Sequence, residues 1–273
     1  MPEHVPRPPR SPRFLAVALL AAVTGALPAA AQQAQPTVDD TYRLFQRFVE
    51  DGAISPHVWL EGQVRMQTNS PVFGPGDGDR WTTDAVLGLG LTEELEVGLR
   101  LGLIHLDPDA GDSDNGLSDI EVHAKYRLDE LPLDIVVGGI VKIPTADEDE
   151  GLGTGELDFE GFGAVRKDLG HVSLIGNAGL RFNGDPDGSV GVDTKTSILL
   201  GGGLIIGLTS RIHNSWELTY ESKRFEGGET DVRLTPGLGW RLGNRGLFRA
   251  AVGIGLSDGA PDFEAIAGLV LTY

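Results

Sequence analysis

Residues 119–127, Asp-Ile-Glu-Val-His-Ala-Lys-Tyr-Arg, decide the fold. Every even-numbered residue of this stretch is apolar or aromatic, and every odd-numbered residue is ionisable. Successive side chains of a β-strand point to opposite faces, so this strict alternation predicts a strand with one apolar and one polar face. About ten residues of tilted strand also suffice to cross a bilayer.

Segments of this kind recur along the chain from residue 57 onward. An even number of strands brings both ends of an antiparallel barrel to the same side of the membrane, and the sequence contains twelve segments. The strands are expected near 57–67, 81–91, 95–105, 117–127, 133–143, 155–166, 171–182, 195–206, 213–224, 230–241, 247–256 and 262–272.

The connections between these segments alternate in length. Long connections are expected at 68–80, 106–116, 144–154, 183–193, 225–229 and 257–261. Short turns lie between them, for example at 92–94, 128–132, 168–170 and 242–246. Outer-membrane barrels have short turns at one end and longer loops at the other. A soluble, lipocalin-like barrel is the alternative architecture, because a period of two does not say which face lies inside.

The first residues have the composition of an export signal. Arg7, Arg10 and Arg13 precede an apolar run over 14–27, and three alanines at 29–31 supply a cleavage site. This order predicts a cleaved signal peptide over 1–31, because the apolar run is too short to span a membrane as a helix. The mature protein is therefore expected in the cell outer membrane.

Residues 32–56 form a separate segment before the first strand. Within 41–50, Tyr42, Phe45, Phe48 and Val49 share one face of a helical wheel, which predicts a short helix. The segment is either a periplasmic lead-in or a plug that enters the lumen. The expected fold is thus an all-β antiparallel transmembrane barrel of about twelve strands over 57–273, preceded by a signal peptide and a short helix.

Composition limits the partners. The chain has no cysteine and a formal net charge of −18, so we expect no nucleic-acid partner. Outer-membrane lipid, lipopolysaccharide and an unidentified small solute are the expected partners. The alternating end, Leu269-x-Leu271-x-Tyr273, resembles the signal that the barrel-assembly machinery of outer membranes recognises. No cofactor is expected.

If the apolar face meets lipid, ionisable side chains of both signs line the lumen. They could pair across strands and close it, or they could border a water-filled path. The lumen-lining candidates are Arg65, Glu96, Arg100, Glu121, His123, Lys125, Arg127, Lys142, Glu160, Arg181, Glu217, Arg233 and Arg249. The long loops should form an acidic rim that includes Asp109, Asp112, Asp114, Asp147, Glu148, Asp149, Glu150, Asp185 and Asp187.

Two chemical sites are considered and not adopted. The aspartates of 106–119 suit calcium, but the run lacks the Glu and glycine register of a calcium loop, so no specific metal site is predicted. His171, Ser173 and Asn177 have the spacing of outer-membrane phospholipases. Ser173 and Asn177 should face the lumen and not the outer leaflet, and we predict that the protein is not an enzyme.

Several short motifs carry a family resemblance. They are 116–120 (Gly-Leu-Ser-Asp-Ile), 125–128 (Lys-Tyr-Arg-Leu), 143–145 (Ile-Pro-Thr), 151–155 (Gly-Leu-Gly-Thr-Gly) and 177–180 (Asn-Ala-Gly-Leu). In order and spacing they resemble bacterial outer-membrane proteins of the "MetA-pathway of phenol degradation" family, over roughly 85–273. The resemblance implies a barrel that passes small, often aromatic or hydrophobic, compounds, without catalytic residues.

The expected function is passive passage of small solutes through a narrow lumen. The acidic rim should concentrate cations and repel anions. A structural or adhesive barrel with a closed lumen is the alternative, and a lipid hydrolase is a more remote one.

Overall fold

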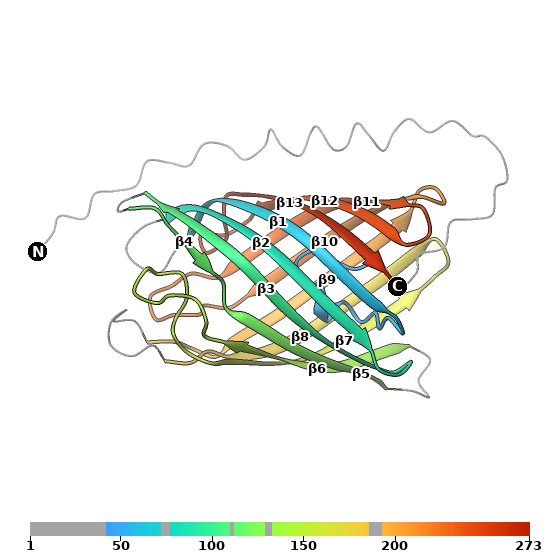
Figure 1. Ribbon diagram of the computed structural model, residues 1–273, viewed down its shortest axis with the longest axis horizontal. Coiled ribbons are helices and arrows are strands. Elements are labelled where there is room, and N and C mark those ends of the chain that lie inside the picture. The colour runs from blue at the N-terminus through green and yellow to red at the C-terminus, as the bar shows by residue number, and fades with distance from the viewer. Residues whose placement is uncertain (1–41, 72–76, 110–111, 129–132, 186–192) are drawn as a thin grey trace, which may run out of the picture. The chain divides into compact units, whose positions relative to one another are not determined.

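The computed structural model describes residues 42–71, 77–109, 112–128, 133–185 and 193–273 (Figure 1). The expected signal peptide, 1–31, lies outside these residues. The strands are β1 (Val58–Pro71), β2 (Asp77–Gly90), β3 (Leu95–Pro108), β4 (Asp114–Leu117), β5 (Ile120–Leu128), β6 (Asp134–Ile143), β7 (Asp158–Asp168), β8 (Val172–Phe182), β9 (Ser197–Gly207), β10 (Ile212–Glu221), β11 (Asp231–Leu242), β12 (Gly246–Gly255) and β13 (Phe263–Thr272).

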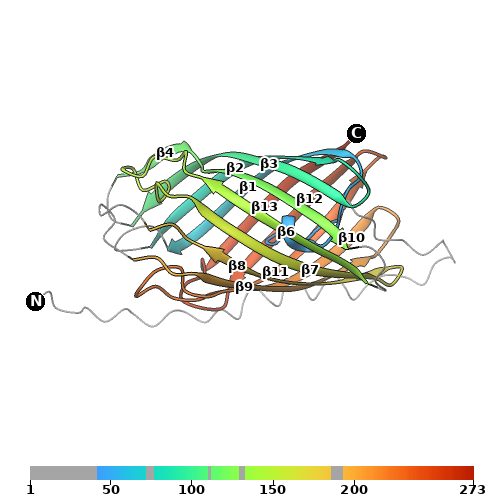
Figure 2. The same ribbon diagram turned by 90° about the horizontal axis from the view of Figure 1, so that it is seen from below.

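The strands form one closed antiparallel barrel. Apart from the short β4, which β3 bypasses to pair with β5, each strand pairs with its neighbours in sequence. Strand β1 closes the ring by pairing with β13, from Trp59 opposite Thr272 to Thr68 opposite Phe263. Strand β4 pairs only with the outer end of β3, so the ring itself has twelve strands. The tilted wall and the loops at its two ends are visible in Figures 1 and 2. The prediction of a twelve-stranded antiparallel barrel is confirmed.

The alternating residues of 119–127 point alternately to the inner and the outer face of the barrel wall. On β5, Val122 and Tyr126 are 41% and 47% exposed on the outer face, whereas His123 and Lys125 are buried on the inner face. The apolar side chains of the wall therefore point outward, as contact with hydrocarbon requires. This orientation excludes the lipocalin-like alternative, in which the apolar face would lie inside.

Two strand boundaries differ from expectation. The expected loop 68–80 is largely strand, because β1 continues to Pro71 and β2 begins at Asp77. The expected strand 117–127 is interrupted after Leu117. There the Asp119 carboxylate accepts hydrogen bonds from the backbone N–H groups of Thr145 and Ala146, both at 3.1 Å, and so joins the wall to the following loop.

The helix expected over 41–50 is wrong. Over residues 42–56 the structure has a single 3-10 helix of three residues, η1 (Val49–Asp51), which ends at Gly52 with a φ of 85°. The backbone N–H groups of residues 45–47 donate to the Glu217 side chain and not to carbonyls one turn back. Side chains of the barrel wall thus replace the hydrogen bonds that a helix would supply. Within the described ranges, no helix has the length and hydropathy needed to span a membrane.

Candidate functional site

Residues 42–56, termed the lumen segment, precede β1, and all of them except the exposed Pro56 are buried or half-buried inside the barrel (Figure 2). The segment starts near the end with the short turns, where the Tyr42 ring stacks on His213 at 3.4 Å between centroids. It reaches the middle of the lumen at Gln46, which donates to the Glu264 carboxylate of β13. It then returns to the short-turn end, where the Ser55 N–H donates to Glu96 at 2.8 Å. The segment therefore narrows the path through the barrel.

Glu217 of β10 is the main backbone anchor of the lumen segment. Its carboxylate accepts three successive N–H groups, from Phe45 and Arg47 (2.9 and 2.8 Å) and from Gln46 (2.8 Å). Each such hydrogen bond contributes about 0.5–1.5 kcal/mol to stability. One wall residue thus fixes three backbone units at the tip of the segment.

Ion pairs hold the rest of the segment. Arg43 donates to both oxygens of Glu96, at 2.9 and 2.6 Å, and Lys125 of β5 approaches the same carboxylate at 3.3 Å. Lys125 also donates to the Val49 carbonyl at 3.0 Å. Removing one partner of such a buried pair leaves an uncompensated charge, which costs about 3–5 kcal/mol. These contacts favour a segment that stays in one position.

Two arginines act together with aromatic rings. The Arg43 guanidinium lies 4.7 Å from the ring centroid of Trp59, and Arg249 of β12 lies 4.3 Å from that of Phe45. Arg249 also pairs with Glu61 at 3.1 Å and donates to the Leu44 carbonyl. A wall arginine thus contacts a ring of the lumen segment, and an arginine of the segment contacts a ring of the wall.

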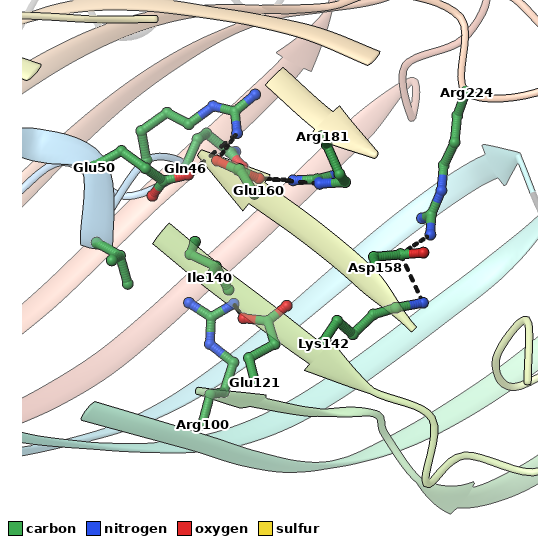
Figure 3. Close-up of a pocket in the computed structure, with 12 residues that line it drawn as sticks. Gln46, Glu50, Arg100, Glu121, Ile140, Lys142, Asp158, Glu160, Arg181 and Arg224 are labelled. Carbon is green, nitrogen blue, oxygen red and sulfur yellow. Dashed lines mark hydrogen bonds and ion pairs between the residues drawn. The ribbon is translucent and has the colours of Figure 1, made fainter. Parts of the chain in front are cut away.

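Beyond the tip of the lumen segment, toward the long loops, is a cavity of about 150 Å³, termed the chamber (Figure 3). Its lining comes from the lumen segment, from strands β3, β5, β6, β7 and β8, and from the connection between β10 and β11. The residues are Gln46, Arg47, Val49, Glu50, Arg100, Glu121, Ile140, Lys142, Asp158, Glu160, Arg181 and Arg224. Ionisable side chains dominate, and Val49 and Ile140 are the apolar members.

Opposite charges face one another across the chamber wall. Arg181 donates to Glu160 at 2.8 Å, and Arg100 pairs with Glu121 at 2.9 Å. Asp158 lies between Lys142 and Arg224, at 2.8 and 2.7 Å. These pairs leave the lining without a large excess of either sign, so the chamber suits neutral polar solutes and water as well as ions.

Glu50 brings a carboxylate of the lumen segment to the chamber. Burial by itself would raise the pKa of this carboxyl, but the Arg47 guanidinium at 3.2 Å and backbone hydrogen bonding outweigh it, and the pKa lies below its ordinary value. Glu50 is therefore ionised at neutral pH.

The loop between β6 and β7 folds over the outer side of the chamber. Its Leu152 and Ala146 pack with Ile104 and Leu106, which point inward from the end of β3. The hydroxyl of Thr154 in the same loop accepts from Lys142 at 3.2 Å. The chamber thus lies between two pieces of irregular chain, the lumen segment on one side and this loop on the other.

All thirteen lumen-lining candidates have buried or half-buried side chains in the barrel. The buried ones are Glu96, His123, Lys125, Glu160, Glu217 and Arg249. The half-buried ones are Arg65, Arg100, Arg127, Glu121, Lys142, Arg181 and Arg233. Five of them meet at the chamber wall, namely Lys142 and the pairs Arg100–Glu121 and Arg181–Glu160. The others contact the lumen segment or pair with acidic and basic side chains elsewhere in the lumen, as Arg233 does with Asp231 and Glu264.

The predicted acidic rim residues lie in or next to the long loops that connect the strands. Exposed members are Asp109, Asp112, Asp147, Glu148, Asp149, Glu150 and Asp185. Asp114 is half-buried, and Asp187 lies outside the described residues. The described part of the chain holds no group of three or more metal-ligating side chains arranged around one point.

Sequence reasoning missed the polar residues of the lumen segment and Arg224. Arg43, Gln46, Arg47 and Glu50 alternate irregularly with aromatics, so neither a period of two nor one of 3.6 indicates their positions. The available signal was the presence of charged residues among the aromatic ones. A helix that packs at a membrane surface has charged residues on one face, whereas these would lie on every face of the helix.

Ser173, considered above as a nucleophile, has other partners. Its hydroxyl donates to the Asp168 carboxylate and accepts from Arg166 at 3.4 Å. The His171 side chain is exposed at the start of the strand. The serine is part of a polar cluster that supports the lumen segment, since Arg166 also donates to the Tyr42 carbonyl at 3.1 Å.

A comparison with protein families identifies the chain's family. A family model described as "Putative MetA-pathway of phenol degradation" covers residues 60–273. The chain belongs to that family. The MetA-pathway resemblance of the short motifs is thereby confirmed, and the match begins just after the lumen segment. A comparison with curated proteins found no match.

Solved structures similar to this MetA-pathway family member are outer-membrane barrels. An outer membrane channel from Pseudomonas putida F1 has a TM-score of 0.58 at 16% identity, over 82% of this chain and 98% of that one. The NanC porin gives 0.53 at 9% identity, over 79% and 98%. The KdgM porin, solved with a disordered oligogalacturonate, gives 0.50 at 14% identity, over 79% and 99%. The fold is that of outer-membrane channels and porins.

Proposed function

We propose that this protein passes small solutes across the outer membrane by passive diffusion through its lumen. The observation that carries the proposal is the chamber. It is a polar space of about 150 Å³ between the lumen segment and the outer loop, inside a wall whose apolar side faces outward. Family membership and the channel-like fold support the same reading.

Small aromatic or hydrophobic compounds are the solutes that we favour. The support is the family description, which refers to phenol degradation. The burial of residues 42–55 inside the lumen agrees with it, because these residues narrow the path that a solute would take. No cofactor or energy source enters the proposal.

The test is single-channel conductance of the refolded mature protein in a planar bilayer, with potassium chloride gradients. We expect a small steady conductance with a preference for potassium, because the exposed acids of the loops concentrate cations. Absence of conductance, from protein shown to be folded and inserted, would contradict an open path.

A structural barrel with a closed lumen is the second candidate. The buried ion pairs that hold the lumen segment favour it, for example Arg43 with Glu96 and Arg249 with Glu61. In that case the exposed acidic loops would serve to bind divalent cations that bridge lipopolysaccharide phosphates. Conductance discriminates between the two candidates.

A further inference from the structure

One charged side chain in the lumen has no counter-ion among the described residues. Arg80 lies near the start of β2, at the end of the barrel that carries the long loops, and it is half-buried. It is on the inner face of the wall, because Trp81 and Leu87 of the alternate set are exposed. Its guanidinium makes no hydrogen bond or ion pair with the described part of the chain, and its Nε is buried without a partner. A charged donor at such a place requires an acceptor.

The ionisable groups around Arg80 are mostly cations. The four that act most strongly on its charge are three arginines and one acid, namely Arg224, Arg233, Arg65 and Asp119. Like charges repel more strongly in a partly desolvated site than in water, because the effective dielectric constant is lower. An anion bound among these arginines would relieve the repulsion.

The acids on this side of the lumen are engaged by other groups. Asp119 pairs with Lys142 at 3.1 Å, and its carboxylate also accepts two backbone N–H groups of the loop between β6 and β7. Asp84, four residues along the same face of β2, has Arg100 as its strongest cationic neighbour. Neither acid forms an ion pair with Arg80 in the described structure.

The other arginines of the group have acids that they share or hold closely. Glu264 of β13 pairs with both Arg65 and Arg233, at 3.1 and 3.4 Å. Arg224 pairs with Asp158 of β7 at 2.7 Å (Figure 3). These contacts leave the charge of the β2 arginine to an anion from solution.

The shape of the donor and the charge of the rim limit which anion fits. A guanidinium presents two parallel N–H groups that match the two oxygens of a carboxylate. The exposed acids of the long loops, for example Asp147 and Asp149, repel a divalent anion about twice as strongly as a monovalent one. A monovalent carboxylate is therefore favoured over sulfate.

We propose that the outer half of the lumen is a binding site for a small monovalent carboxylate, which accepts hydrogen bonds from the guanidinium of Arg80. Arg224, Arg233 and Arg65 add positive charge around the bound anion. The inference goes beyond the proposed function, because the site can fill from the end with the long loops whether or not solutes cross the whole lumen.

Fluorine NMR titration of the refolded mature protein in a non-ionic detergent tests the site. The probes are trifluoroacetate and trifluoroethanol, which share a trifluoromethyl group and differ in charge. Wild-type protein should bind trifluoroacetate and show no saturable binding of trifluoroethanol. Arg80→Gln should weaken trifluoroacetate binding about tenfold or more, because hydrogen bonds to a charged group are lost. Arg80→Lys should weaken it several-fold, since the charge remains but the fork is lost.

Arg211→Gln is the matched control. Arg211 is exposed in the turn between β9 and β10, at the other end of the barrel, so its removal changes the net charge by the same amount. It should bind trifluoroacetate as the wild type does. Equal affinity of Arg80→Gln and wild type, or an equal loss in Arg211→Gln, overturns the proposal.

Competition on the wild type tests the choice of anion without any substitution. At equal ionic strength, acetate should displace trifluoroacetate at a lower concentration than sulfate does. Displacement by sulfate at the lower concentration overturns the assignment to a monovalent carboxylate. Conductance is a separate readout, since a barrel that binds trifluoroacetate as described but does not conduct retains the site and contradicts only the passage of solutes.

Discussion

Gly88 on β2 shows how single residues set the position of the lumen segment. A β-carbon at this position would lie 2.0 Å from the Trp59 indole, which in turn contacts Phe48 edge-on at 5.3 Å between centroids. Gly88→Ala should therefore displace Trp59 and lower the free energy of unfolding by about 1–3 kcal/mol, as overpacking does. Urea unfolding of the refolded protein in detergent measures this.

Gly62→Ala is the control at the residue scale. A β-carbon at Gly62 meets nothing within 4 Å, although the residue lies on the neighbouring strand β1. Its stability should stay within about 0.5 kcal/mol of the wild type. Equal destabilisation by both substitutions would mean that any strand glycine affects stability when it is replaced. The contact with Trp59 would then not be the cause.

At the scale of elements, the loop between β6 and β7 is held to the barrel by apolar packing. Leu152 is 4% exposed in its cluster, whereas Leu157 of the same loop is 45% exposed. Leu152→Ala should remove about 2–3 kcal/mol of packing and loosen the loop. A protease that cleaves after acidic residues should then cut at 147–150 several-fold faster in proteoliposomes. Leu157→Ala should leave the rate unchanged, and equal rates for both variants would contradict the packed loop.

Strands and turns were predictable from sequence because the barrel wall has a lipid-facing and a lumen-facing side. Apolar and polar residues must therefore alternate at nearly every position of a strand. The break after Leu117 was not, since it depends on Asp119 reaching backbone donors 26 and 27 residues away. The lumen segment was not predictable for the same reason. Glu217 meets Phe45 across 172 residues, and no local period encodes such a contact. Of the candidate site, sequence parity indicated the lumen-facing charges of the wall but not the chamber that they form with Gln46, Arg47 and Glu50.

On the scale of the whole molecule, the exposed acids of the long loops predict ion selectivity. Replacing Asp147, Glu148, Asp149 and Glu150 by their amides should lower the potassium-to-chloride permeability ratio toward one. Reversal potentials in low-salt gradients measure the ratio. The difference from wild type should disappear near 1 M salt, where the Debye length is about 3 Å. An unchanged ratio at low salt would mean that these acids lie away from the path of the ions.

The central claim is that the lumen segment, anchored by Glu217, sets the width of the path. Its most direct test is the single-channel conductance of Glu217→Gln beside that of Glu221→Gln. Glu221 lies on the same face of β10 and pairs with Arg181 at 3.0 Å, whereas the three N–H bonds to the segment belong to Glu217. We predict that Glu217→Gln, shown to be folded by heat modifiability, conducts several-fold more than wild type and that Glu221→Gln does not. Equal conductance of Glu217→Gln and wild type would contradict the account.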